Sequence, residues 1–110
     1  MGVTRSEIFS DAQNQLASLF KVLGHPARIA ILQQIINRKA CICNDLVDEL
    51  GLAQPTISQH LKELKNIGII QGTIEGKAVC YCIDETVWRA LQQQFNDFFN
   101  QDVLASGECC

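Results

Sequence analysis

The 110-residue sequence predicts a mainly α-helical domain with a β-hairpin before its last helix. Apolar residues recur at spacings of three and four over most of the chain, as they do on one face of an α-helix. Between residues 69 and 83 the pattern changes to runs rich in β-branched residues around the turn Glu75-Gly76-Lys77. We therefore expect the order α-α-α-α-β-β-α in one domain, residues 1–100, followed by a flexible tail, residues 101–110.

The first two helices are expected at residues 6–23 and 26–37. Gly24-His25-Pro26 separates them, because proline interrupts a helix but suits the first turn of a new one. His25 is either a metal ligand or a turn residue, and the second interpretation is more common for a lone histidine beside proline. The second helix is expected to bury four apolar side chains, Ile29, Leu32, Ile35 and Ile36.

Residues 44–68 have the pattern of a helix-turn-helix. Asn44 is a suitable N-cap for the first helix and Gly51 is placed to end it. The second helix opens near Pro55 and has one apolar side, formed by Ile57, Leu61, Leu64 and Ile67. Its polar side carries residues of the kinds that contact bases and phosphates in the DNA major groove, namely Thr56, Ser58, Gln59, Lys62 and Lys65. Helical hairpins also occur in proteins that bind no nucleic acid, but their surfaces more often carry Glu, Lys, Ala or Arg.

The hairpin that follows this helix is expected to be a wing, with Lys77 at its tip placed to contact a phosphate or the minor groove. The last helix, from Glu85 to about Asn100, contains Trp88, Phe95, Phe98 and Phe99, four of the seven aromatic residues. A helix this apolar at the end of a small domain needs another surface to pack against. We therefore expect a homodimer formed through the first and last helices.

The net charge of −3 argues against an indiscriminate polyanion binder. The charge is uneven, since residues 1–83 carry +1 and residues 84–110 carry −4. Any DNA-binding face must be local, built from Arg38, Lys39, Lys62, Lys65 and Lys77, and its affinity should depend on salt. The sequence contains neither an apolar run of membrane-spanning length nor a secretion signal, which predicts a cytoplasmic protein without membrane contact.

Six cysteines stand at positions 41, 43, 80, 82, 109 and 110. Neither a pair two residues apart nor a vicinal pair joins distant segments, so we do not expect the disulfide framework of a small secreted protein. In a reducing cytosol these clusters are more typical of soft-metal ligands or reactive thiols. Cys80 and Cys82 lie on one side of a strand, about 6.6 Å apart along it, and are weaker candidates because apolar filling is slightly favoured there.

The element order, with LGHPARIAIL before the first cysteine pair and LAQPTISQHLKELKNIGII across the second helix of the helix-turn-helix, resembles the ArsR/SmtB family of winged-helix repressors. The resemblance covers roughly residues 12–100. It implies a homodimeric repressor, not an enzyme, that binds a double-stranded DNA operator and leaves it when a metal or metalloid binds. By position it implies DNA contacts from Gln54, Thr56, Ser58, Gln59, His60 and Lys62.

The metalloid-responsive members place a Cys-x-Cys at the entrance of the helix-turn-helix, where Cys41-Ile42-Cys43 stands. Here the pair sits about one residue earlier than usual, and Val47 stands near the position of a third cysteine. The resemblance implies As(III) or Sb(III) as inducer, with no cofactor required for DNA binding. Cys41 and Cys43 are then the core ligands, and Cys109 or Cys110 completes the set because the tail could reach them. The zinc-type site is expected to be absent, since both histidines lie outside the last helix.

Two alternatives remain open at this stage. The same fold could act as a thiol redox switch, released from DNA by peroxide. A thiol-disulfide or metal-buffering protein, for which DNA is irrelevant, ranks last because no C-x-x-C motif follows a strand.

Overall fold

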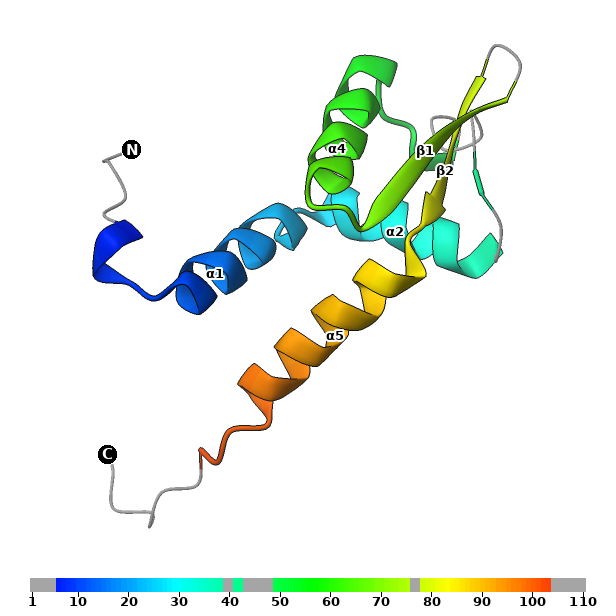
Figure 1. The fold of residues 1–110 in the computed structure, drawn as a ribbon. Helices are drawn as coiled ribbons and strands as arrows, with labels where there is room; N and C mark the ends of the chain where they lie inside the picture. The colour runs from blue at the N-terminus through cyan, green and yellow to red at the C-terminus, as the bar shows by residue number, and fades with distance from the viewer. Residues whose placement is uncertain (1–5, 39–40, 43–48, 76–77, 104–110) are drawn as a thin grey trace.

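A computed structural model describes residues 6–38, 41–42, 49–75 and 78–103 (Figure 1). A 3₁₀ turn η1 (Ser6–Ile8) precedes the helices α1 (Asp11–Leu23), α2 (Pro26–Arg38) and α4 (Gln54–Asn66). The hairpin strands β1 (Ile70–Glu75) and β2 (Ala78–Ile83) follow, and α5 (Glu85–Phe99) ends the domain. The mainly α fold with a hairpin wing confirms the predicted class.

The predicted five-helix order is only partly seen, because the described residues contain four α-helices. The helix expected at residues 44–50 falls mainly on residues 43–48, which lie outside the described ranges. Glu49 and Leu50 are helical, and Gly51 ends that helix with a φ of 68°. This left-handed conformation favours glycine, which explains why the stop signal was readable from the sequence.

The first helix is shorter than predicted, because η1 and α1 are separated at Phe9 and Ser10. Ser10 forms a capping box with Gln13: its Oγ accepts from the Gln13 amide at 3.1 Å, and its own amide donates to Gln13 Oε1 at 3.0 Å. These bonds satisfy amides that have no intrahelical partner at a helix start. The apolar periodicity runs through this cap, which is why it did not reveal the break.

The turn between α1 and α2 confirms the structural interpretation of His25. Its Nδ1 accepts a hydrogen bond of 3.1 Å from the Ala27 amide, and its carbonyl accepts from the amides of Arg28 and Ile29. His25 therefore helps to start α2 at Pro26.

The buried side of α2 differs from the prediction by part of a turn. Ile31 is fully buried with Leu32 and Ile35, whereas Ile29 and Ile36 are 42% and 41% exposed. The helix packs against α1, α4 and β2. The apolar stripe of α2 is wider than its packing surface, so Ile29 and Ile36 at its edges stay exposed. The periodicity alone does not show which apolar residues lie at the edge.

One hydrophobic core joins all the helices to the wing. Its buried members are Leu19, Ile31, Leu32, Ile35, Ile42, Ile57, Leu61, Leu64, Ile69, Ile70 and Leu91. Each fully buried Leu or Ile stabilises the fold by about 1.5–3 kcal/mol. The predicted inner face of α4 is confirmed, since Ile57, Leu61 and Leu64 are buried and Ile67 packs against the core.

The wing is a two-stranded antiparallel hairpin that pairs Ile70 with Ile83 and Glu75 with Ala78. Beside it, Ile42 forms an isolated antiparallel bridge with Tyr81. Cys41 and Ile42 therefore lie against β2. Over the described ranges, every helix is too short or too polar to cross a membrane.

Candidate functional site

The outer face of α4 is a continuous polar surface. Gln54, Thr56, Ser58, Gln59, Lys62 and Lys65 are all exposed. Pro55 lies in the first turn, and the N-cap Ala53 makes no side-chain capping bond. Because a helix start carries unpaired amides and a partial positive charge, this end suits an anionic group.

Two of these side chains have specific neighbours. Gln59 Nε2 donates to Glu63 Oε1 at 3.2 Å, one turn further along the helix. Lys65 reaches the wing, where its Nζ lies 3.5 Å from the point that a Cβ on Gly72 would occupy. The Tyr81 ring lies 3.3 Å from the same Cβ position. Because Gly72 has no side chain, the Lys65 amine has room there. Lys65 thus lies between α4 and β1.

His60 does not belong to this outer face, and its position contradicts the DNA contact implied by the resemblance. It is 7% exposed, and its Nδ1 accepts a hydrogen bond of 3.0 Å from Arg28 Nε. Arg28 Nη1 also donates to the Val22 carbonyl at 3.0 Å, and the His25 ring lies 4.4 Å from that of His60. Burial lowers the pKa of His60, and the charges of His25 and Arg28 lower it further. His60 is therefore a neutral acceptor that ties α4 to the α1–α2 turn.

The other predicted cations are distributed differently. Arg38, at the end of α2, forms an ion pair with Glu49, which lies just before the turn of the helix-turn-helix. Lys39 and Lys77 lie outside the described residues. This ion pair joins the end of α2 to the end of the first helix of the helix-turn-helix, so Arg38 is not an isolated charge.

Cys41 pairs with a cysteine of a different cluster. Cys41 and Cys82 form a disulfide with Cα atoms 4.4 Å apart and a sequence separation of 41. Cys80 is buried at 2% exposure and is also disulfide-bonded. These bonds correct the expectation that the cysteine motifs do not join distant segments, and they overturn the apolar-filler interpretation of Cys80 and Cys82. Sequence spacing within a motif could not reveal this pairing, because it depends on the bridge between Ile42 and Tyr81.

A complete metal-ligand set is not formed within the described ranges, where no three Cys, His, Asp or Glu side chains converge. Cys43, Cys109 and Cys110 lie outside those ranges. The sulfur chemistry that the described residues bring together is that of Cys41 and Cys82.

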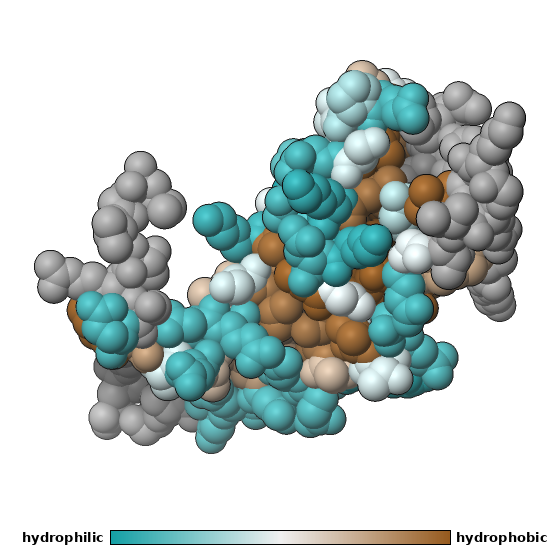
Figure 2. Space-filling model, turned by 45° about the horizontal axis from the view of Figure 1, so that its top comes forward, coloured by the Kyte–Doolittle hydropathy of each residue, from teal (hydrophilic) through white to brown (hydrophobic). Residues whose placement is uncertain are grey.

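A second surface of interest joins α1 and α5 through aromatic side chains. The Phe20 ring stacks on Phe95 at 4.9 Å and meets Phe98 and Phe99 edge-on at 6.0 and 6.1 Å. Phe98 is 45% exposed and Phe99 67% exposed, so this cluster is open to solvent in a single chain. On the face that Figure 2 views, a separate observation is a hydrophobic patch in the middle of the molecule, bordered by hydrophilic side chains.

A polar-faced helix held on an apolar core and followed directly by a hairpin defines the winged helix-turn-helix class. Residues 25–71 match the family model described as "Bacterial regulatory protein, arsR family". A relative from Methanocaldococcus jannaschii, an uncharacterized HTH-type transcriptional regulator, is 41% identical over 73 residues, 64% of this chain and 81% of the relative. The chain belongs to the arsR family, which consists of transcriptional regulators rather than enzymes.

Other relatives extend this comparison. The HTH-type transcriptional repressor SmtB of Mycobacterium tuberculosis is 43% identical over 63 residues, 57% of this chain and 46% of SmtB. The chain thus matches about half the length of that relative. The arsenical resistance operon repressor of Staphylococcus xylosus is 29% identical over 109 residues, with 86% of this chain and 96% of the relative covered.

A solved structure supports the fold over nearly the whole chain. The transcriptional repressor BigR from Xylella fastidiosa superposes with a TM-score of 0.62 at 26% identity. The match covers 93% of this chain and all of BigR.

Proposed function

We infer that the chain is a homodimeric transcriptional repressor whose hold on a double-stranded DNA operator is controlled by the oxidation state of Cys41 and Cys82. The observation that carries this proposal is the disulfide that joins the segment before the helix-turn-helix to the wing. It connects the segment that leads into the helix-turn-helix with the second strand of the wing.

DNA reading is assigned to the outer face of α4. Gln54 and Gln59 can bond adenine edges, Thr56 and Ser58 can bond bases or phosphates, and Lys62 and Lys65 can neutralise phosphates. All six side chains are exposed. We assign Lys77 of the wing to a phosphate or minor-groove contact, as its place in the sequence suggests. A role on DNA also agrees with the predicted cytoplasmic location.

Control by oxidation follows from where the disulfide lies. Thiols are kept reduced in the cytosol, so a disulfide that forms there is usually a transient or sensing one. The cross-link fixes the position of Cys41 on the wing, and Arg38 and Glu49 connect the flanking helix ends. We propose that α4 and the wing adopt the DNA-binding arrangement in the reduced chain. In the oxidised chain, the disulfide holds them in a different arrangement that binds DNA less well.

The redox step balances with a peroxide as oxidant. Two thiols and R–O–OH give one disulfide, R–OH and water, and the sulfurs lose the two electrons that the O–O bond gains. Cys41 is exposed and Cys82 is half-buried, so at least one sulfur is open to the reagent.

A second candidate is release by As(III) or Sb(III), which the resemblance implied. It is favoured by the facing sulfurs of Cys41 and Cys82, since thiolates are suitable ligands for soft ions. It is also favoured by the similarity to a repressor named for arsenical resistance. A third thiolate would come from Cys43, Cys109 or Cys110. Such a complex would join the same two segments as the disulfide.

The homodimer is proposed through α1 and α5. The open aromatic cluster of Phe20, Phe98 and Phe99 supports this interface, together with the exposed Ile8 and Phe9 near η1. Exposed apolar surface of this kind commonly marks a protein interface. A two-fold dimer would also present two copies of α4 to two half-sites.

The test begins with selection of a binding site from a random duplex library by the reduced protein. Anisotropy titrations then compare reduced, peroxide-treated and arsenite-treated protein, beside a Cys41→Ser, Cys82→Ser double variant. We expect peroxide to weaken binding of the wild type at least tenfold, about 1.4 kcal/mol, and to leave the variant unchanged. Release by micromolar arsenite without a peroxide effect favours the second candidate. Failure to select any DNA removes the repressor assignment.

A further inference from the structure

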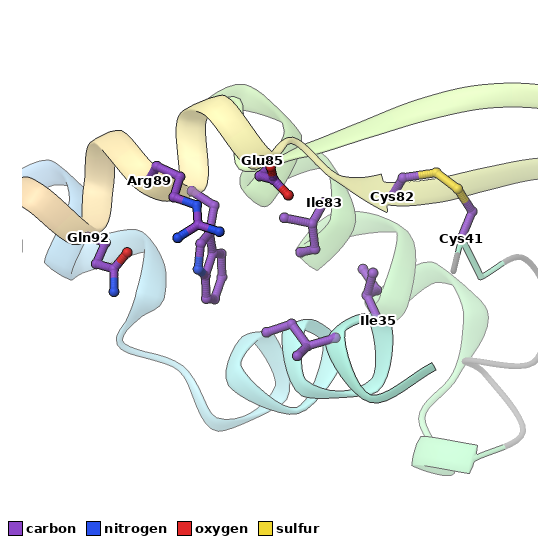
Figure 3. A pocket seen from close by; sticks show the side chains of 9 residues that line it. Ile35, Cys41, Cys82, Ile83, Glu85, Arg89 and Gln92 are labelled. Atoms are coloured by element: carbon purple, nitrogen blue, oxygen red, sulfur yellow. A yellow bond between two sulfur atoms is a disulfide. The ribbon is translucent and has the colours of Figure 1, made fainter. Parts of the chain in front are cut away.

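A cavity of about 500 Å³ lies between α2, β2 and α5, beside the Cys41–Cys82 pair. Figure 3 shows both sulfurs at one end of it, with Ile35 on α2 facing Ile83 at the end of β2. A water molecule takes up roughly 30 Å³ in the liquid, and a hydrogen peroxide molecule is only slightly larger. Pockets for organic ligands are roughly 300–1,000 Å³. The space beside the sulfurs therefore suits an organic molecule.

The walls of the cavity are of two kinds. Ile35, Ile36 and Trp88 form an apolar wall, and Ile36 is 41% exposed. Arg89 and Gln92 of α5 provide hydrogen-bond donors on the same cavity. An apolar body with one polar end is the ligand shape that such a lining complements.

Arg89 is suited to hold the polar end. Glu85 lies one helical turn before it on the cavity lining, yet within the described part of the chain Arg89 makes no ion pair. Its guanidinium can bond a carboxylate through two parallel N–H groups. In Figure 3, Arg89 and Gln92 lie on the side of the cavity opposite the two sulfurs. This separation sets the polar end apart from the reacting sulfurs.

Resting on the proposed redox function, we propose that this cavity binds long-chain organic hydroperoxides with a carboxylate end, and that these are the oxidants of Cys41 and Cys82. The acyl chain lies on Ile35, Ile36 and Trp88, the carboxylate on Arg89, and the hydroperoxide at the sulfurs.

The reaction requires no other reagent. One cysteine thiolate attacks the terminal oxygen of R–O–OH, an S–O bond forms, and the O–O bond breaks. The leaving alkoxide takes the proton that the thiol released and becomes R–OH, which leaves a sulfenic acid. The second thiolate attacks that sulfur, the S–S bond forms, and hydroxide leaves with the second proton as water. Binding in the cavity accelerates the first attack by holding the reacting atoms together.

The experiment measures the oxidation rate of the reduced full-length chain, without DNA, by rapid alkylation and intact mass. The oxidants are linoleic acid hydroperoxide, its methyl ester and hydrogen peroxide. We expect the acid hydroperoxide to react at least about tenfold faster than hydrogen peroxide, as a bound substrate should. Ile36→Asn should remove most of that advantage and leave the hydrogen peroxide rate within about twofold, since only the chain-binding wall changes.

Arg89→Gln should slow the acid hydroperoxide roughly tenfold, the loss expected for a charged hydrogen bond, and leave the methyl ester unchanged. Two matched controls should behave as wild type: Ile29→Asn, on the same helix and 42% exposed but outside this cavity, and Lys62→Gln on α4. Equal rates for all three oxidants, or equal slowing of the acid and the ester by Arg89→Gln, would overturn the proposal. If oxidation proves selective but leaves DNA affinity unchanged, the cavity assignment stands and the redox-repressor function fails.

Discussion

Ile42 and Tyr81 exchange two backbone hydrogen bonds: the Ile42 amide donates to the Tyr81 carbonyl at 3.0 Å, and the Tyr81 amide donates to the Ile42 carbonyl at 2.8 Å. In an antiparallel bridge the neighbours of a paired residue also lie opposite each other. The bridge therefore places Cys41 opposite Cys82 without any need for the covalent bond. The bridge and the disulfide therefore join the same two segments at neighbouring positions.

Reduction should destabilise the fold. A cross-link over 41 residues lowers the entropy of the unfolded chain, which is worth about 3 to 4 kcal/mol in the loop-closure model. In a Cys80→Ser variant, in which the second disulfide cannot form, we expect a phosphine reductant to lower the free energy of unfolding in urea by about that amount. Adding Cys109→Ser and Cys110→Ser to that variant should leave the loss unchanged, because the tail thiols are not part of the Cys41–Cys82 bond. Identical urea midpoints with and without reductant would show that the cross-link adds no stability.

Single substitutions on α4 should separate base reading from phosphate binding. Gln59→Ala should weaken binding of the selected operator roughly tenfold or more, because a bidentate base contact is worth about 1–3 kcal/mol. Lys62→Gln should instead weaken all duplexes similarly and reduce the salt slope of log K by about 1. Anisotropy titrations on operator and scrambled DNA over a range of salt measure both effects.

Gln93→Ala is the matched control for Gln59→Ala. Gln93 is exposed on α5 and donates to Asp97 Oδ1 at 2.7 Å, as Gln59 does to Glu63 at 3.2 Å. It should leave operator affinity unchanged. Equal losses from Gln59→Ala and Gln93→Ala would remove α4 as the base-reading helix.

His60 should make the fold sensitive to acid. Its pKa is lowered below the ordinary 6.5 in the folded chain, first by burial and then by His25 and Arg28. The folded chain therefore binds this proton less readily than the unfolded chain does. The stability linked to His60 is fully present above pH 6.5, and it is lost as the pH falls through the lowered pKa.

Urea unfolding of oxidised protein at pH 7.5 and 5.5 measures this effect. The wild-type midpoint should fall on acidification more than that of His60→Asn, whose amide oxygen can accept from Arg28 but does not titrate. His25→Asn should keep a smaller pH dependence, because it removes one cause of the lowered pKa but leaves His60. A fall in His60→Asn as large as in the wild type would assign the acid sensitivity to other groups.

Local signals account for the parts of the fold that the sequence predicted. Gly24-His25-Pro26 ends one helix and starts the next, Gly51 takes a left-handed φ of 68°, and the β-branched runs form the hairpin. Each of these features depends on residues close together in the chain. The capping box at Ser10 is also local, since Ser10 and Gln13 three residues later mark the start of α1 in the sequence.

The missed features depend on residues that only the fold brings together. Arg28 and His60 are 32 positions apart, and their hydrogen bond turns an expected DNA contact into an internal link. Cys41 and Cys82 meet because Ile42 pairs with Tyr81. Helical periodicity identifies the polar side of α4, but it does not show that His60 lies at the edge of the buried side.

The aromatic cluster should hold the dimer together. Phe99 is 67% exposed in the single chain, so Phe99→Ser should leave the monomer fold intact while removing apolar contact at the α1–α5 surface. Truncation of a central aromatic residue commonly costs an interface about 2 kcal/mol or more, roughly a 30-fold rise in the dimer dissociation constant. Sedimentation of the wild type, Phe99→Ser and Val79→Ser measures that constant, with circular dichroism to verify folding.

Val79 is a matched control because it is 42% exposed but lies on the wing, where substitution should not weaken the dimer. Since two copies of α4 are needed to span two half-sites, Phe99→Ser should also lower operator affinity in proportion to the loss of dimer. A dimer that withstands Phe99→Ser would place the two-fold interface elsewhere.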